Sequence, residues 1–185
     1  MSSKRAKPGR GLGSSAPEGE PWFWMTRSMN GSLLFQALGI SARRILDRLL
    51  EEHMSHGGKE NGNLISTHRQ LESWGVTRND IGKGFRELEA AGFVVCTFES
   101  HKQSAGAAPS RYRLTWLSAK PGCDPSADSV PLWQKRQTEL AKQGFDIKAT
   151  RKWLAEQVSE RCKVRKNKPN PLPSQIKTVT PTKNI

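Results

Sequence analysis

The residues that can build a hydrophobic core are concentrated in one part of this chain. Of its 36 Leu, Ile, Val and Phe residues, 23 lie within residues 21–120, and the other 85 of the 185 residues share the remaining 13. A charged segment with so few apolar side chains buries too little surface to offset the conformational entropy that folding removes. We therefore expect one compact domain of roughly 100 residues with mobile flanks.

The chain is also strongly basic, with 30 Lys and Arg residues against 17 Asp and Glu residues and a net charge of +13. The excess rises along the chain, from +2 over residues 1–20 to +4 over residues 21–120 and +7 over residues 121–185. A basic tail on a mildly basic domain favours a polyanionic partner, with nucleic acid the first candidate. A ribosomal partner or an anionic membrane surface would satisfy the same charge.

Several classes of protein are excluded by what the sequence lacks. No apolar run approaches the roughly 18 residues that a membrane span needs, and residues 1–21 contain no hydrophobic stretch of the kind found in a secretion signal. Cys96, Cys123 and Cys162 are odd in number and widely spaced, which argues against a disulfide framework. These features favour a cytoplasmic protein with reduced thiols and no membrane partner.

The sequence shows no pattern typical of catalysis or of cofactor binding. His53 and His56 lack Cys or carboxylate partners at zinc-ligand spacing, and His53 falls on the apolar face of its predicted helix. The segment Gly82-Lys83-Gly84 does not have the spacing of a phosphate-binding loop. We therefore expect no enzyme, no catalytic residue, no metal and no cofactor.

Hydrophobic periodicity and turn signals predict a succession of short helices and strands. Helices are predicted over residues 33–38, 41–56, 67–74 and 77–92, and strands over residues 64–65, 93–98 and 111–117. Ser41 is a favourable N-cap for the second helix. Thr67 with Gln70 has the spacing of a capping box, and Thr77 with Asp80 repeats it. A glycine ends each of these helices.

Composition divides the chain into five parts. They are a disordered N-terminal arm (1–21), a folded domain (22–118), a linker (119–131), a helical extension (132–162) and a disordered basic tail (163–185). The last two strands enclose a polar loop and form a hairpin. The expected fold class is therefore mainly α with a small β-hairpin, an α+β protein.

The predicted order of helix, helix, short strand, helix, turn, helix, strand, loop and strand is that of a winged helix-turn-helix. The stretches 41–50, 56–64, 70–81 and 89–94 strongly resemble small bacterial winged-helix proteins of plasmids, phages and mobile elements, which are similar to winged-helix modules of plasmid replication initiators and transcriptional regulators. The resemblance covers about residues 22–117. It implies a winged helix-turn-helix domain in a bacterial, cytoplasmic protein that binds double-stranded DNA.

The helix predicted over residues 77–92 is the candidate recognition helix. Its residues Ile81, Phe85 and Leu88 form an apolar stripe that must face the core. The candidate DNA-binding residues are polar side chains at its start and on its opposite face: Thr77, Arg78, Asn79, Lys83 and Arg86. Such side chains can read base edges or hold phosphates, although any amphipathic helix of a basic protein shows a charged face. Gly82, beside the outward face, lets the helix approach DNA closely, or both Gly82 and Gly84 pack against another helix.

Two further groups of basic residues are candidates for DNA contact. The hairpin, as a wing, contributes His101, Lys102, Arg111 and Arg113, unless it is only a solvated edge strand protected by charge. The tail contributes a sequence-independent electrostatic arm, unless it only solubilises the chain; its basic residues are Arg161, Lys163, Arg165, Lys166 and Lys168. Other aromatic and basic residues are expected to be structural, with Tyr112 and Trp116 in the core and Arg43, Arg44 and Arg48 on a solvated helix face.

The function expected from these features is sequence-specific DNA binding. The resemblance implies a transcriptional regulator or a replication-control factor of a bacterial plasmid or mobile element. The alternative is a protein-docking winged-helix module without sequence-specific readout, in which Trp133 or Trp153 contacts a partner. Besides double-stranded DNA, the expected partners are a second copy of the chain, as a homodimer, and a replication or transcription protein.

Overall fold

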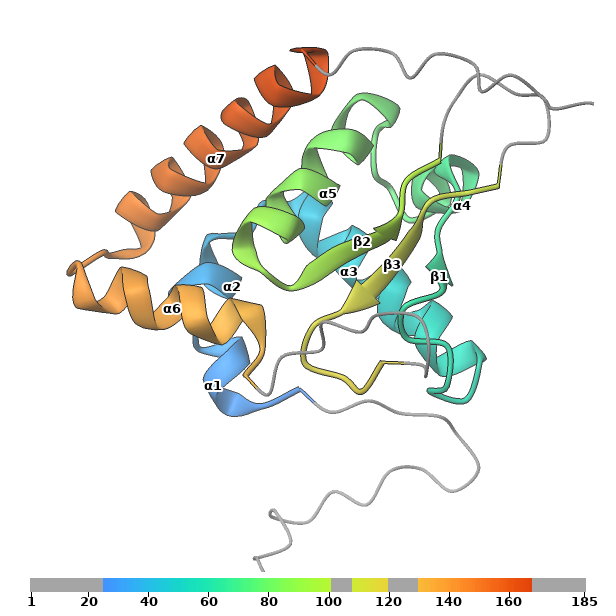
Figure 1. Ribbon diagram of the computed structural model, residues 1–185, viewed down its shortest axis with the longest axis horizontal. Coiled ribbons are helices and arrows are strands. Elements are labelled where there is room, and N and C mark those ends of the chain that lie inside the picture. The colour runs from blue at the N-terminus through green and yellow to red at the C-terminus, as the bar shows by residue number, and fades with distance from the viewer. Residues whose placement is uncertain (1–24, 101–107, 120–129, 168–185) are drawn as a thin grey trace, which may run out of the picture.

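The computed structural model describes residues 25–100, 108–119 and 130–167 of the chain. The described chain is mainly helical with a small antiparallel sheet, an α+β arrangement (Figure 1). Its elements are, in order, α1 (Arg27–Asn30), α2 (Leu33–Ala37), α3 (Ile40–Ser55), β1 (Leu64–Ile65), α4 (His68–Ser73), α5 (Arg78–Ala91), β2 (Val94–Phe98), β3 (Arg111–Leu114), α6 (Leu132–Lys142) and α7 (Ile147–Asn167). The expected N-terminal arm (1–21) and most of the expected linker lie outside the described residues.

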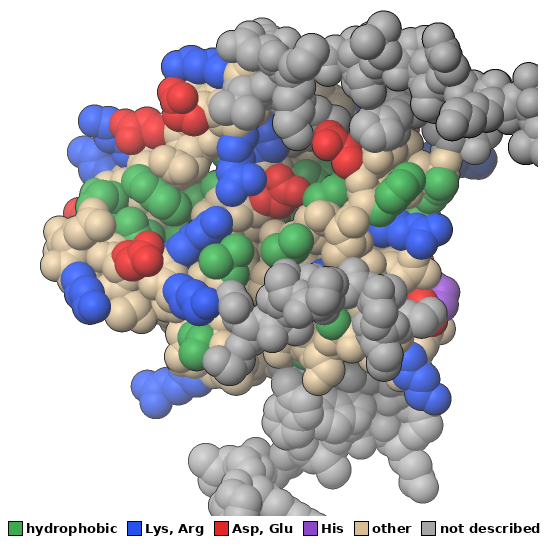
Figure 2. Space-filling view, in the orientation of Figure 1, with side chains coloured by type: hydrophobic (Ala, Val, Ile, Leu, Met, Phe, Trp, Pro, Cys, Tyr) green, Lys and Arg blue, Asp and Glu red, His purple; other side chains and the backbone are tan. Residues whose placement is uncertain are grey.

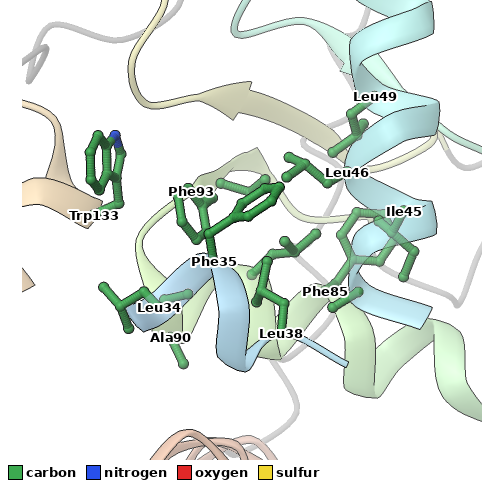
Figure 3. Packing of buried hydrophobic residues seen from close by; sticks show 14 of the residues in the cluster. Leu34, Phe35, Leu38, Ile45, Leu46, Leu49, Phe85, Ala90, Phe93 and Trp133 are labelled. Atoms are coloured by element: carbon green, nitrogen blue, oxygen red, sulfur yellow. The ribbon is translucent and has the colours of Figure 1, made fainter. Parts of the chain in front are cut away.

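Helices α3 and α5 pack against each other at the centre of the core. The apolar stripe predicted for α5 is confirmed, because Ile81, Phe85 and Leu88 are buried. Figure 3 shows side chains from α2, α3 and α5 meeting around Phe35 and Phe93. The rings of these two residues contact edge to face, with their centroids 5.9 Å apart.

The two glycines of α5 have different surroundings. A Cβ on Gly84 would lie 2.5 Å from the Ile45 Cδ1 and 3.4 Å from the Ala42 backbone, so this position packs directly against α3. Gly82 is exposed, and a Cβ there would meet only the guanidinium of Arg86, with Nη1 at 3.3 Å. Of the two roles considered for these glycines, helix packing is confirmed for Gly84.

The helix caps follow the sequence signals in one case and depart from them in another. The capping box of α4 is confirmed: the Thr67 hydroxyl accepts the N–H of Gln70, whose Oε1 accepts the Thr67 N–H at 2.9 Å. The N-cap predicted for α3 is wrong, because Ser41 lies inside the helix and Gly39 is the N-cap. Gly39 has no side chain to cap the helix, and its own N–H donates to the Glu87 carboxylate of α5 at 2.6 Å. A carboxylate there also interacts favourably with the helix dipole.

The hairpin of β2 and β3 is confirmed, and β1 adds a third strand in the order β1-β3-β2. The register places Val94 opposite Leu114 and Leu64 opposite Tyr112. The Tyr112 ring stacks on Phe85 with centroids 4.2 Å apart, so this face of the sheet packs on α5. Tyr112 therefore belongs to the core, as predicted.

The C-terminal helices share the core of the preceding elements. Trp133 of α6 is 5 % exposed, and its ring stacks on Phe93 with centroids 5.9 Å apart (Figure 3). Gly92 permits this approach, because it adopts φ +84 after α5 and a Cβ there would lie 2.8 Å from the Trp133 backbone nitrogen. Leu154 anchors α7 to the same cluster, and α7 packs against α2 and α5.

Two expectations about polar segments differ from the structure. Helix α7 continues to Asn167, so residues 163–167 of the expected disordered tail are helical. Arg48, expected on a solvated face, is 5 % exposed. Its guanidinium is neutralised by Glu51 and Glu52 at 2.5 and 2.8 Å, and this pairing allows its burial. No helix in the described part of the chain is long and apolar enough to cross a membrane.

Candidate nucleic-acid interface

The turn between α4 and α5 is held by a contact from α3. The Arg44 guanidinium donates a hydrogen bond to the Gly75 carbonyl oxygen. Gly75 has φ +78, and a Cβ there would lie 2.7 Å from the Arg44 Nη1. Only glycine combines this backbone conformation with so close an approach. Arg44, predicted to be solvated, is half-buried and ties the turn before α5 to α3.

The first half of α5 presents an exposed polar face. Thr77 is the N-cap residue, but its hydroxyl donates to the Asp80 Oδ2 at 2.6 Å and does not cap the backbone. Arg78, Asn79 and Lys83 are all exposed to solvent. The polar face predicted for this helix is therefore present over its first two turns.

Arg86 belongs to the second half of α5, but its guanidinium lies over the first half. Its Nη1 would be 3.3 Å from a Cβ on Gly82, one turn closer to the start of the helix. Side chains on a helix tilt toward its N-terminus, and the absent side chain at Gly82 leaves room for this one. Gly82 thus seats the Arg86 guanidinium on the exposed half of α5.

The polar side chains on this face are not used by the described fold. Within the residues that the structure describes, Arg78, Asn79, Lys83 and Arg86 form no hydrogen bond and no ion pair. The Asp80 carboxylate accepts a hydrogen bond from the Thr77 hydroxyl. Apart from the buried Arg86 Nε, their donors are available to a ligand. Cationic and amide donors together suit the phosphates and base edges of nucleic acid.

The second half of the same face is covered by α6 and α7. Ala90 is 2 % exposed, and Arg136 of α6 donates to the carbonyl oxygens of Glu89 and Ala90. Arg161 of α7 pairs with the Glu89 carboxylate at 3.5 Å. Burial, followed by the nearby positive charge of Arg161, lowers the pKa of Arg136. Arg161, predicted to belong to a free basic tail, is therefore a contact between helices.

The hairpin residues divide into exposed, buried and undescribed positions. Arg111 is exposed, and its guanidinium lies over the Phe98 ring, 5.6 Å from the centroid. Arg113, predicted on the outer face, is 7 % exposed. The prediction that Arg113 is exposed is therefore wrong. Its strand β3 is also the central strand of the sheet, between β1 and β2, and not an edge strand. His101 and Lys102 lie outside the described residues.

The predicted tail cluster is divided in the same way. Lys163 is exposed on α7, and its Nζ donates to Glu160 Oε1 at 2.8 Å. Arg165 and Lys166 lie within α7, although the described side chains end before them. Lys168 lies outside the described residues. The first residues of the basic segment therefore form the last turns of α7. Its Lys- and Arg-rich composition did not predict this helix.

The other residues singled out in the sequence have structural surroundings. His53 is 7 % exposed, and its Nδ1 has no hydrogen-bond partner in the described chain; burial lowers its pKa. Across residues 25–100, 108–119 and 130–167, no three His, Cys, Asp or Glu side chains are grouped as metal ligands would be. Trp133 is a core residue and Trp153 packs half-buried against the core, so Trp133 is not accessible to a docking partner.

The geometry therefore brings together one coherent set of predicted residues, on the first half of α5. Comparisons of the chain with protein-family models, curated proteins and solved structures find no match.

Proposed function

We propose that this protein binds double-stranded DNA through a winged helix-turn-helix domain, with α5 as the recognition helix and the β2–β3 hairpin as the wing. The order α3, β1, α4, α5, β2, β3 supports this assignment, as does the tight turn at Gly75 that joins α4 to α5. The net charge of +13 favours a polyanionic partner. The proposed role is transcriptional regulation or replication control, in line with the sequence resemblance.

The observation that carries the proposal is the unpartnered polar face of α5. Asn79 can form paired hydrogen bonds with an adenine edge, and Lys83 and Arg86 can do so with guanine or hold phosphates. Arg78, at the start of the helix, is placed for a backbone phosphate. Because α5 is fixed to α3 at Gly84, these side chains would be presented on a rigid element.

Because the second half of α5 is covered, one copy of the protein can read only a short stretch of DNA sequence. The exposed part, residues 78–86, is about 13 Å long at the usual helical rise. That length matches about four base pairs at 3.4 Å each. A second copy on a neighbouring half-site, one helical turn away, would extend the recognised sequence. We therefore propose that a homodimer is the specific DNA-binding form.

A matched pair of lysine variants tests this proposal. Lys83→Ala removes a charge from the polar face of α5, and Lys142→Ala removes the same charge from an exposed position on α6. Binding would be measured on a duplex enriched from a random library and on a scrambled duplex. We expect Lys83→Ala to weaken binding to the enriched duplex about tenfold, as loss of roughly 1.4 kcal/mol implies, and Lys142→Ala to leave it within twofold. Equal binding by the two variants would contradict the proposal and favour a docking role.

A further inference from the structure

Helix α7 runs alongside α5 in the opposite direction (Figure 1). Leu154 and Val158 hold it in place, with exposed fractions of 2 % and 7 %. Farther along α7, the ion pair between Arg161 and Glu89 fixes how the two helices align. These apolar and charged contacts of α7 all lie before residue 162.

The end of α7 extends beyond this ion pair toward the exposed half of α5. From Arg161 to Asn167 the helix continues for six residues, which is about 9 Å at 1.5 Å per residue. The same length on α5, counted back from Glu89, reaches Lys83. Because the two helices run in opposite directions, the end of α7 comes level with the exposed half of α5.

The two helices bring basic residues together at this level. Residues 161–167, Arg-Cys-Lys-Val-Arg-Lys-Asn, contain four basic residues and no acidic one. Arg161 is paired with Glu89 and Lys163 with the exposed Glu160, so Arg165 and Lys166 supply most of the excess positive charge of this segment. Beside them, Arg78, Lys83 and Arg86 have no ion-pair partner in the described chain. Figure 2 shows Lys and Arg side chains gathered between α5 and α7, with some acidic side chains next to them.

We propose that residues 161–167 of α7 and the exposed half of α5 form one composite strip for the phosphate backbone of duplex DNA. In this arrangement α7 is a fixed second DNA-contacting helix, whereas a flexible basic tail would contact phosphates in no set position. The inference rests on the proposed function and adds to it, because it places the basic end of α7 on the phosphates beside the groove that α5 enters.

Two variants of the full chain separate charge from position. In the first, four residues, Gly-Ser-Gly-Ser, are inserted between Cys162 and Lys163. Every charge is kept, as are the contacts of Leu154, Val158 and Arg161, but the end of the helix loses its alignment. In the second, Lys163→Gln and Arg165→Gln remove two charges. Binding to duplex DNA is measured at a series of salt concentrations, and unfolding by heat confirms that both variants fold. Lys148→Gln with Lys152→Gln, at the other end of α7, removes the same charge as a control.

We expect the double Gln variant to lower the slope of log affinity against log salt by about 1.8, since each lost phosphate contact contributes about 0.9. The insertion should lower it by a similar amount, and the control should leave it unchanged. An insertion variant that binds like the wild type would overturn the fixed position of α7, and a double Gln variant that does so would overturn the contact itself. If the proposed sequence-specific function is wrong, selection from a random duplex library gives no enriched motif. The insertion variant still tests the strip in that case, because its salt dependence can be measured on a duplex of arbitrary sequence.

Discussion

Gly84 of α5 lies so close to Ile45 of α3 that a Cβ on residue 84 would come within 2.5 Å of the Ile45 Cδ1. This contact sets how α5 lies on α3, and hence the direction in which its polar face points. Gly82, only two residues earlier, lies on the exposed side and carries no such contact. The two glycines therefore offer a matched test of packing against surface.

Replacing each glycine by alanine should move stability in opposite directions. Gly84→Ala forces a methyl group into the α3–α5 contact, and overpacking of this kind costs about 1–3 kcal/mol. Gly82→Ala should stabilise the protein by about 1 kcal/mol, because alanine is the better helix former. Urea denaturation of both variants measures these changes. A Gly84→Ala protein as stable as the wild type would contradict the tight packing of α3 on α5.

Gly82→Ala should also weaken DNA binding although it strengthens the fold. A methyl group at residue 82 would lie 3.3 Å from the Arg86 Nη1 and would force the guanidinium to shift by a few tenths of an ångström on the polar face. We expect the affinity for a specific duplex to fall while the melting temperature rises. Unchanged affinity would show that Arg86 does not need this seat.

The C-terminal helices should prove essential to the stability of the domain. Trp133→Ala removes the ring that stacks on Phe93, and deletion of a buried aromatic side chain costs about 3–5 kcal/mol. Trp74→Ala is the matched control, because Trp74 is 39 % exposed and its loss should change stability by no more than about 0.5 kcal/mol. Thermal unfolding of the two variants measures the difference. Similar melting temperatures would place α6 outside the core.

His53 should make the protein less stable in mild acid. Burial lowers the pKa of His53 in the folded state below its ordinary value of 6.5, so the unfolded chain binds the proton more tightly. The stability that this residue contributes is complete above about pH 6.5 and is lost as the pH falls through the lowered pKa. Denaturation at several pH values between 7 and 5 measures the loss.

The control for this prediction removes a different histidine. His53→Gln should flatten the stability profile in that pH range, and His68→Gln, at an exposed position of α4, should keep the loss because His53 remains. A wild-type profile that is flat between pH 7 and 5 would count against burial of a neutral imidazole.

Sequence reasoning succeeded where the deciding contacts lie within a turn or two of chain. Thr67 and Gln70 cap the same helix, and Gly92 ends α5 in the left-handed conformation that glycine favours. The polar set on the first half of α5 follows from helical periodicity in the same way. Signals of this kind depend on residues that are close in sequence, so they can be recognised from one amino-acid sequence.

The failures concern residues whose partners are distant in sequence. Arg161 pairs with Glu89, seventy-two residues earlier, and the Glu87 carboxylate of α5 accepts the N–H of Gly39, the N-cap residue of α3. Asn61 joins the loop before β1 to β3 through the Leu114 N–H and carbonyl oxygen. Each depends on tertiary packing, which periodicity and composition do not encode. For the same reason, the coverage of the second half of α5 was not predictable.

The central claim, base readout by the first half of α5, is tested most directly by selection from a random duplex library near physiological salt. The full-length wild type and the Asn79→Ala variant would be compared after sequencing the bound duplexes. We predict an enriched motif for the wild type and, for the variant, loss of preference at one or two positions of that motif with the others kept. No enrichment by the wild type, with binding that disappears as salt rises, would leave only sequence-independent attraction and would contradict the account.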